Sequence, residues 1–378
     1  MKTKKVLFTA TVVKKHIVEF HLPYLKWFKD HGYETYVAAN NDYNTVEECI
    51  IPYCDHFIEI PFTRNPISIS NIIAYLMLKK LIIDQHFDII HCNTPVGGVL
   101  TRLAARKARS FGTKVVYTAH GFHFYRGSSI IAWALYYPIE KICSKYTDAI
   151  ITINREDYQI AKSKFSAKNT YLVHGVGVNF NSRPNYVDDS IYQSIKCNSD
   201  DFIICTTAEL ISRKNQKLII EAMKNPILLN NKHIKYVLIG DGKNKSQYLQ
   251  LINSNHLANR IILLGYRTDV YNILQHSSVF AFPSLREGLP VSLMEAMYCQ
   301  LPCLVCDVRG CRDLIDNEKG GYICSNNADD FANKINYLFR NSEVSKKYGE
   351  YNLEKVKPYM IDQVLKEYAN IYCSLLKE

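Results

Sequence analysis

Two carboxylates, Glu287 and Glu295, stand eight positions apart in the run REGLPVSLMEAM, residues 286–297. The run follows the apolar stretch SVFAF and predicts a strand, a loop and a helix, with Pro290 in the first helical turn. The free N–H groups of residues 288–292 form an anion site, since the helix dipole places about +0.5 charge there. Acids beside an anion site favour a ligand with phosphates and vicinal hydroxyls, as on a ribose or a sugar ring. Two solvated acids near a helix start are the alternative.

A second loop, in AELISRKNQKLIIEAM, places Arg213 and Lys214 just before a predicted helix. Cations at the start of a helix are repelled by its dipole, so their presence there needs a reason, and a bound diphosphate supplies one. The alternative is that Arg213 and Lys214 are simply solvated. In IGDGKNKS, Gly240 allows close backbone approach, although G-x-G-x-x-G is absent. Tyr266 and Arg267 in LLGYRTDV are expected to border a base, unless this is an ordinary loop.

Histidines follow a predicted strand in the first half of the chain. His120 and His123 lie in TAHGFHFYRGSS, directly after the strand TKVVYTA. An imidazole at a strand end is able to contact a sugar hydroxyl or a leaving phosphate, although a lone histidine is usually structural. His16, in the first strand-helix loop, is a weaker candidate for a phosphate or acceptor contact.

Alternation of short apolar strands with helical segments predicts two doubly wound α/β domains, because strands that are apolar throughout suit covered parallel sheets. The expected domains are residues 1–180 and 181–357, followed by a closing helix over 358–378 that packs back on the first domain. Ligands of such sheets bind at the carboxyl ends of the strands, so the expected site is a cleft between the domains. The predicted strands are KKVLFTA, ETYVAA, FDIIHC, TKVVYTA, TDAIITI, NTYLVHG, DFIICTT, IKYVLIG, RIILLG, SVFAFPS, LPCLVC and GGYIC.

The composition of the 378 residues, 47% hydrophobic and 22% charged, excludes a disordered chain. The 12 cysteines indicate reduced thiols rather than a disulfide scaffold. The first apolar run, residues 6–13, predicts a buried strand rather than a signal peptide. The longest, residues 130–139, is too short to span a bilayer but suits its interface.

The net charge of +10 is concentrated in residues 1–180, which carry 22 Lys and Arg against 14 Asp and Glu. Aromatic residues near 122–137 and a helical stripe of Arg102, Arg106 and Arg109 lie in the same basic half. We therefore expect the first domain to dock on an anionic bilayer. A packed aromatic core and a solvated basic face are the alternative.

No metal is expected. The chain contains no Asp-x-Asp triplet. Cys299, Cys303, Cys306 and Cys311 do not have the spacing of paired C-x-x-C zinc ligands, and two of them fall in an apolar strand.

In this order the loops resemble family 4 of the retaining glycosyltransferases, which have the GT-B fold, and most closely its bacterial capsule and exopolysaccharide branch. The resemblance covers nearly the whole chain and rests on EGLPVSLMEAM, TAHGFHFY, AELISRKNQ, LIGDG and LGYRTDV. It implies that Glu295 holds the ribose of a sugar nucleotide, that Glu287 binds the donor sugar, and that Lys214 neutralises the leaving diphosphate. It also implies that His120 reaches the donor sugar and that sugar and phosphate are held by the backbone of Gly288, Leu289, Pro290 and Val291.

The expected activity is transfer of a sugar from a nucleotide-sugar donor, a UDP-sugar, to an undecaprenyl-diphosphate-linked saccharide in capsular, exo- or O-polysaccharide synthesis. No cofactor and no nucleic acid are expected, and the expected location is the cytoplasmic face of the plasma membrane. The sequence departs from the pattern of this family at two places. Many relatives have an arginine at the position of Glu209, and Arg213 is a candidate substitute for its charge. Many also have a Gly-Gly turn after the first strand, which is absent from TATVVKKH. A GT-B epimerase, a phosphorylase and a non-catalytic nucleotide-sugar-binding protein are the alternatives.

Overall fold

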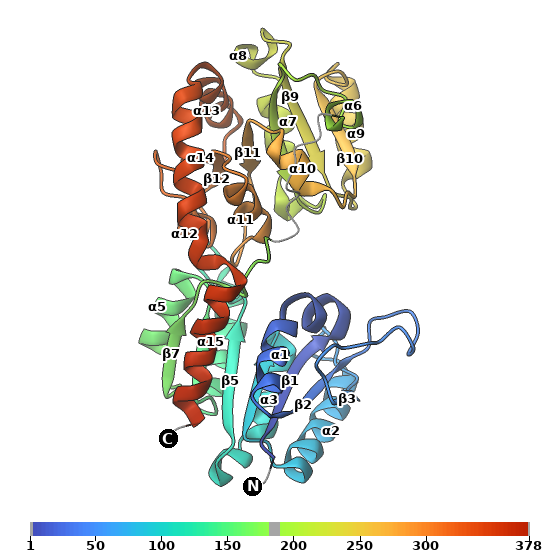
Figure 1. Ribbon diagram of the computed structural model, residues 1–378, viewed down its shortest axis with the longest axis vertical. Coiled ribbons are helices and arrows are strands. Elements are labelled where there is room, and N and C mark those ends of the chain that lie inside the picture. The colour runs from blue at the N-terminus through green and yellow to red at the C-terminus, as the bar shows by residue number, and fades with distance from the viewer. Residues whose placement is uncertain (1–2, 181–189, 377–378) are drawn as a thin grey trace. The chain divides into compact units, whose positions relative to one another are not determined.

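The computed structural model of the protein describes residues 3–180 and 190–376. The chain divides into two compact units, the first comprising Met1–Gly177 with Ile361–Glu378 and the second comprising Val178–Met360. Each boundary lies three residues from the one expected from the sequence, at 180 and at 357. Both units are parallel sheets with helices on their faces, as Figure 1 shows, which confirms the predicted pair of doubly wound α/β domains.

Unit 1 contains a seven-stranded parallel sheet in the order β3-β2-β1-β4-β5-β6-β7. Its central strands are buried except at their ends, because helices cover both faces and leave no polar side to the sheet. The strands are β1 Lys5–Val12, β2 Glu34–Asn40, β3 His56–Glu59, β4 Ile89–Asn93, β5 Lys114–Ala119, β6 Ala149–Thr152 and β7 Asn169–Leu172.

The helices of unit 1 include the last helix of the chain. The hydroxyl of Tyr372 on α15 forms a hydrogen bond of 2.7 Å with Nδ1 of His91, and the ring of Tyr368 lies 4.5 Å from that of Tyr24. These buried contacts fix α15 against α1 and against β4 of the sheet. The helices are the π-helix η1 Val13–Val18, α1 Leu22–Asp30, α2 Ile69–Gln85, α3 Pro95–Ala105, the 3-10 helix η2 Ala108–Phe111, α4 Ile130–Ser144, α5 Arg155–Lys164 and α15 Ile361–Leu376.

Unit 2 contains a six-stranded parallel sheet in the order β10-β9-β8-β11-β12-β13. Its strands are β8 Phe202–Thr207, β9 Ile234–Ile239, β10 Ile261–Gly265, β11 Val279–Phe282, β12 Cys303–Cys306 and β13 Gly321–Cys324. Its helices are α6 Ile191–Ser194, η3 Ser212–Lys214, α7 Lys217–Ala222, α8 Pro226–Leu229, α9 Lys245–Ser254, α10 Val270–Gln275, α11 Val291–Tyr298, α12 Cys311–Leu314, α13 Ala328–Arg340, α14 Ser342–Val356 and η4 Lys357–Tyr359.

In each sheet the strand order reverses once, between β1 and β4 in unit 1 and between β8 and β11 in unit 2. All strands are parallel, so their carboxyl ends meet at one edge, and the loops that leave the two strands of a reversal diverge to opposite faces. The space between such loops is where sheets of this kind hold ligands. Lys214 follows β8, Glu287 follows β11 and His16 follows β1, which places all three at a reversal.

Candidate functional site

Glu287 is the centre of a buried polar cluster in unit 2. Its carboxylate oxygen Oε1 accepts hydrogen bonds from Lys214 Nζ at 2.7 Å, from Ser284 Oγ at 2.6 Å and from Arg213 Nη1 at 3.3 Å. The side chains of Glu287 and Lys214 are only 8% and 14% exposed, so solvent screens their attraction weakly. We call these four residues the Glu287 cluster.

Backbone contacts hold the two loops of the Glu287 cluster together. Leu285 N–H donates to the carbonyl of Arg213 at 2.9 Å, and Arg213 Nη1 donates to the carbonyl of Arg286 at 2.8 Å. The ammonium of Lys214 also lies 4.8 Å from the ring centre of Phe282, at the end of β11. The position of Lys214 relative to Glu287 is therefore set by both loops and does not depend on one ion pair.

The loop after β12 supports the cluster from a third side. Arg309, which is buried, donates from Nε to the carbonyl of Glu287 at 3.0 Å. Gly310 has φ +76°, and a Cβ at that position would lie 2.3 Å from the carbonyl oxygen of Gly288. Glycine is required there because both the left-handed backbone and the close approach exclude a side chain.

Glu295 lies on α11, which begins directly after Pro290. Pro290 has extended backbone angles, φ −78° and ψ 118°, so it precedes the helix and does not form its first turn as predicted. No described side chain caps the first amides of α11, and Leu289 packs on the core beneath them. Glu295 is half-buried and accepts a bond of 3.4 Å from the hydroxyl of Tyr271. Burial raises the pKa of Glu295 to about 7, against the weaker opposing effect of Tyr271.

The other residues predicted in unit 2 lie outside the Glu287 cluster. Gly240 has φ +135°, and a Cβ there would lie 2.1 Å from the carbonyl oxygen of Ala208, so close approach of the loops after β8 and β9 requires glycine. Tyr266 is 80% exposed. Arg267 forms a bidentate pair with Asp269 at 2.7 and 2.5 Å, and its Nη2 also donates to Ser194 Oγ on α6 at 3.2 Å.

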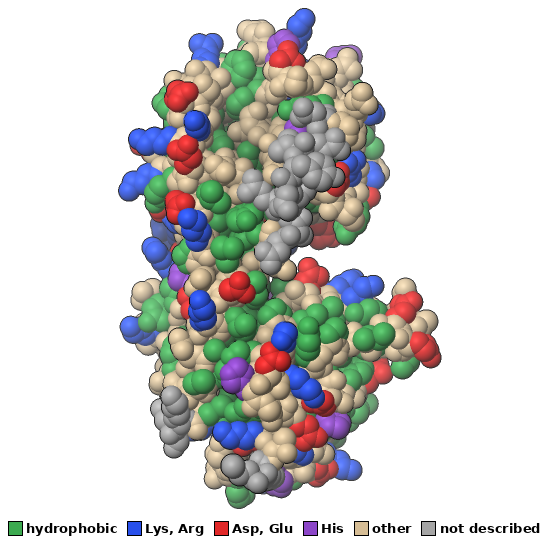
Figure 2. Space-filling model, viewed as in Figure 1, with side chains coloured by type: hydrophobic (Ala, Val, Ile, Leu, Met, Phe, Trp, Pro, Cys, Tyr) green, Lys and Arg blue, Asp and Glu red, His purple; other side chains and the backbone are tan. Residues whose placement is uncertain are grey.

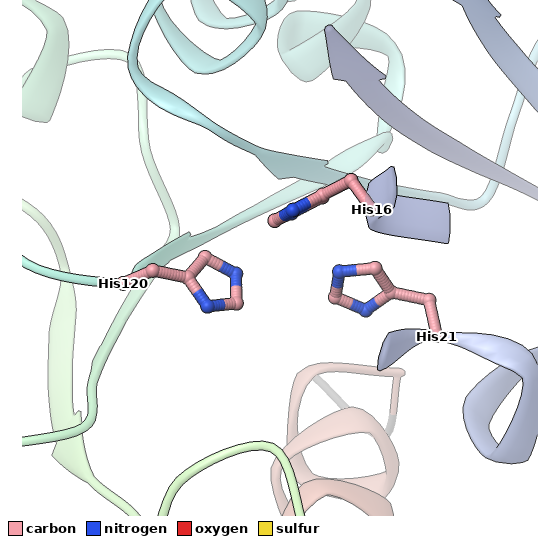
Figure 3. A group of neighbouring side chains, drawn as sticks. All are labelled: His16, His21 and His120. Carbon is pink, nitrogen blue, oxygen red and sulfur yellow. The ribbon is translucent and has the colours of Figure 1, made fainter. Parts of the chain in front are cut away.

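Three histidines converge at the carboxyl edge of the unit 1 sheet (Figure 3). His120 follows β5, His16 lies in η1 and His21 immediately precedes α1. The ring centres of His16 and His120 are 4.8 Å apart, those of His16 and His21 5.0 Å, and those of His21 and His120 5.8 Å. We call these three residues the histidine cluster.

Burial lowers the pKa of His120 to about 4 and also lowers the pKa values of His16 and His21, with mutual repulsion as a smaller cause. The three imidazoles are therefore neutral near pH 7. His123, predicted beside His120, instead lies with its ring 4.7 Å from that of Tyr136 on α4. His21 was not predicted from the sequence, because nothing in FHLPYL distinguishes it from a structural histidine until the strand order is known.

The predicted basic stripe on α3 is wrong. Arg102 is fully buried and donates from Nη2 to Glu140 on α4 at 2.8 Å, while Arg109 donates to Asp148 at 2.8 and 2.9 Å. Arg106 is exposed, and Arg109 lies beyond α3 in η2, so the three arginines do not form one basic face. On the face drawn in Figure 2, Lys and Arg side chains are scattered among acidic and apolar ones in both units.

Apolar side chains are exposed on two helices that flank α3. Right-handed crossovers put α2, α3 and α4 on the same face of the sheet, and α3 contacts both neighbours. None of the described helices is long and apolar enough to cross a membrane. The exposed residues are Ile69, Ile72, Ile73, Leu76, Met77 and Ile83 on α2, and Ile130, Ile131, Leu135, Ile139 and Ile142 on α4.

Comparisons with known proteins match both units to glycosyltransferases. Residues 24–176 match the model "Glycosyltransferase Family 4", and residues 188–355 match "Glycosyl transferases group 1". The chain is 39% identical to "Putative glycosyltransferase EpsD" of Bacillus subtilis (strain 168), over 99% of this chain and 97% of that one. It is 30% identical to an Escherichia coli enzyme named UDP-Gal:alpha-D-GlcNAc-diphosphoundecaprenol alpha-1,3-galactosyltransferase, over 72% of this chain and 71% of that one.

Among solved structures, Anabaena HepE in complex with UDP and glucose superposes with a TM-score of 0.78 at 17% identity, over 98% of this chain and all of that one. The superposition covers both units, so the two proteins share the fold of both domains and not of one alone.

Proposed function

Because the chain belongs to glycosyltransferase family 4 and has the GT-B fold of two Rossmann-like domains, we propose that it transfers a sugar from a UDP-sugar to an undecaprenyl-diphosphate-linked saccharide, with retention of configuration. The observation that carries the proposal is the Lys214–Glu287 pair at the strand-order reversal of unit 2. The name of the E. coli relative specifies a UDP-sugar donor and a diphosphoundecaprenol acceptor, and HepE binds UDP, which supports both choices.

Lys214 is the residue proposed to stabilise the leaving diphosphate. Negative charge grows on the phosphate oxygen as the bond to the sugar breaks, and a cation already fixed at that point lowers the barrier without reorganising. Arg213 and the uncapped amides at the start of α11 add positive potential in the same unit. These groups supply the charge that a divalent ion would otherwise provide, so we propose transfer without a metal or other cofactor.

Glu287 is proposed to orient the donor sugar. Among the described residues, every hydrogen bond to this carboxylate reaches Oε1, so Oε2 remains as an acceptor for sugar hydroxyls. Ser284 donates to Oε1 at 2.6 Å and holds the carboxylate when Lys214 turns to phosphate. No protein nucleophile is required in this scheme, since the acceptor hydroxyl attacks from the face that the diphosphate leaves.

Glu295 is proposed to accept hydrogen bonds from the two ribose hydroxyls. An ionised carboxylate accepts two parallel hydrogen bonds from vicinal hydroxyls, whereas in a protonated carboxyl one oxygen carries a proton and acts as a donor. The half-buried position of Glu295 on α11 raises its pKa to about 7, so ribose binding competes with protonation near neutral pH.

Unit 1 is proposed to face the acceptor and the membrane. His120 contacts the donor sugar, and His16 and His123 lie in the loops assigned to phosphate or acceptor. The exposed apolar residues of α2 and α4 form one docking face, because both helices cover the same side of the sheet. We place the protein on the inner face of the plasma membrane, where such a face reaches a lipid-linked substrate.

The decisive experiment incubates the purified protein with a panel of UDP- and GDP-sugars and a synthetic undecaprenyl-diphosphate-linked N-acetylhexosamine. Nucleotide release and the glycolipid mass are measured together, and the anomeric configuration of the product is read by NMR. Acceptor-dependent release of UDP with an added sugar of retained configuration supports the proposal. Conversion of the donor sugar without acceptor would identify an epimerase, and binding without turnover would identify a non-catalytic protein.

A further inference from the structure

The histidine cluster joins three loops at one point of unit 1. η1 is a π-helix, a rare form that is common at functional sites, and it brings His16 over the end of β1. The backbone amide of Lys14 in this helix donates to the carboxylate of Asp42 at 2.6 Å, which ties η1 to the segment after β2. In Figure 3 the rings of His16, His21 and His120 point toward a common space.

Three ring nitrogens of the histidine cluster have no protein partner among the described residues. Within the described residues, both ring nitrogens of His21 and Nε2 of His16 are buried without a hydrogen bond, and His21 is only 1% exposed. His91, a buried histidine beneath the cluster, shows the ordinary structural arrangement instead. It bonds Thr118 Oγ1 at 2.8 Å through one nitrogen and the hydroxyl of Tyr372 at 2.7 Å through the other.

We propose that His16, His21 and His120 bind one divalent transition ion of the zinc class. Imidazole nitrogen is a preferred ligand of Zn²⁺, and three histidines with one open position form a known type of zinc site. The ligand nitrogens lie within 4.8 Å of one another. A tetrahedral ion with Zn–N bonds of about 2.0–2.1 Å requires about 3.3 Å between them, so rotations of the side chains that close about 1.5 Å complete the site.

One further contact involves this cluster. Oδ1 of Asn93 lies 3.4 Å from Nε2 of His120, a long contact that leaves this nitrogen, which faces the other two rings in Figure 3, open to an ion. Mg²⁺ and Ca²⁺ prefer oxygen ligands and are not expected here.

The ion is a ligand of this site and is not required for transfer. If the proposed function holds, the ion engages the imidazole of His120 that contacts the donor sugar. Zinc then inhibits transfer, and a chelator leaves transfer intact. This consequence rests on the proposed function, whereas binding of the ion does not.

The test uses the full chain without a polyhistidine tag and titrates it with Co²⁺, whose d–d absorption reports tetrahedral coordination. One Co²⁺ per chain is expected, displaced by Zn²⁺ and not by Mg²⁺. His21→Asn and His16→Asn should each weaken binding at least about tenfold. His123→Asn, in the same loop as His120, is the matched control and should bind as the unchanged chain does. Circular dichroism and the melting temperature establish that each variant is folded.

X-ray absorption of the zinc-loaded, unsubstituted chain gives a result that does not depend on any variant. Three imidazole ligands near 2.0 Å support the site. Binding that survives both substitutions, a ligand shell without imidazole, or no Co²⁺ binding would overturn it. The ratio of the transfer rate with zinc to the rate without zinc should rise toward one in His21→Asn, because this variant loses the inhibitory site. A chain that binds Co²⁺ as expected but shows no transfer refutes the proposed function and not the metal site.

Discussion

Replacement of Lys214 by methionine tests the central assignment. Lys214→Met keeps an unbranched side chain of similar length and removes the ammonium that lies 2.7 Å from Glu287 Oε1. A charge-assisted bond to phosphate is worth about 1.5–3 kcal/mol, and each 1.36 kcal/mol is tenfold in rate. The expected loss is therefore roughly 10- to 150-fold. Because the charge on the leaving phosphate develops in the transition state, the loss should fall on kcat more than on KM.

The same substitution has a smaller effect on stability. Glu287 loses Lys214 but keeps the bond from Ser284 at 2.6 Å and the weaker one from Arg213 at 3.3 Å. The carboxylate therefore stays partly compensated, and the expected decrease in the free energy of unfolding is about 1–2 kcal/mol, below the cost of stranding a buried charge. Methionine also retains apolar contact with Phe282, over which the ammonium lies.

The assay is the initial rate of UDP release with saturating acceptor, alongside urea denaturation of the same preparation. Lys217→Met is the matched control: Lys217 lies three residues further along, at the exposed start of α7, and should transfer at the rate of the unchanged chain. Lys214→Met with a kcat within about twofold of that rate would refute the proposed role of Lys214. A loss of rate matched by a loss of folded protein would instead assign the residue to stability.

Further predictions concern charge, burial and the docking face. Burial raises the pKa of Glu295 from 4.5 to about 7, so the stability that its protonated form contributes is complete below pH 4.5 and is lost as the pH rises to 7. Urea denaturation should show the unchanged chain losing up to about 3 kcal/mol relative to Glu295→Gln over this interval. UDP affinity, measured by calorimetry, should rise more steeply from pH 6 to 8 in the unchanged chain than in Glu295→Gln, the remaining rise being due to ionisation of UDP itself. Arg102→Met removes one partner of a fully buried ion pair and should cost about 3–5 kcal/mol in the free energy of unfolding. Flotation with anionic vesicles should show that Ile131→Asp with Leu135→Asp weakens binding about tenfold or more, whereas Leu249→Asp, exposed on α9 of unit 2, changes nothing. Equal flotation of both variants would contradict the docking face.

Most strands were predictable from the sequence, because a strand that is buried on both faces appears as a continuous run of apolar residues. Twelve predicted runs correspond to strands of the two sheets. The exception is β3, His56–Glu59, an edge strand that pairs only with β2. Its burial pattern is exposed at both ends and intermediate between, so neither an apolar run nor an alternation marks it. β3 forms because it pairs with β2, and the hydrophobic pattern of a sequence does not reveal which strands pair.

The candidate site was predictable where a residue lies in the loop that leaves a strand. Lys214 and Glu287 were predicted as ligand contacts from their places after β8 and β11, and the strand order explains why they meet. Ser284 and Arg309 were missed, although each stands in a loop at the same edge. A serine that hydrogen-bonds a carboxylate looks like any loop serine, because the contact depends on three-dimensional direction.

The free protein holds Lys214 against Glu287, and this pairing explains how unit 2 keeps a cation buried before a phosphate arrives. The side chain of Lys214 is only 14% exposed, so water solvates its charge poorly. The carboxylate of Glu287 compensates for this lost solvation. Under the proposed function, a diphosphate that takes the ammonium leaves Glu287 with its bond from Ser284 and able to accept sugar hydroxyls. We therefore expect this one ion pair to prepare both halves of the proposed donor site, so that binding of either half favours binding of the other.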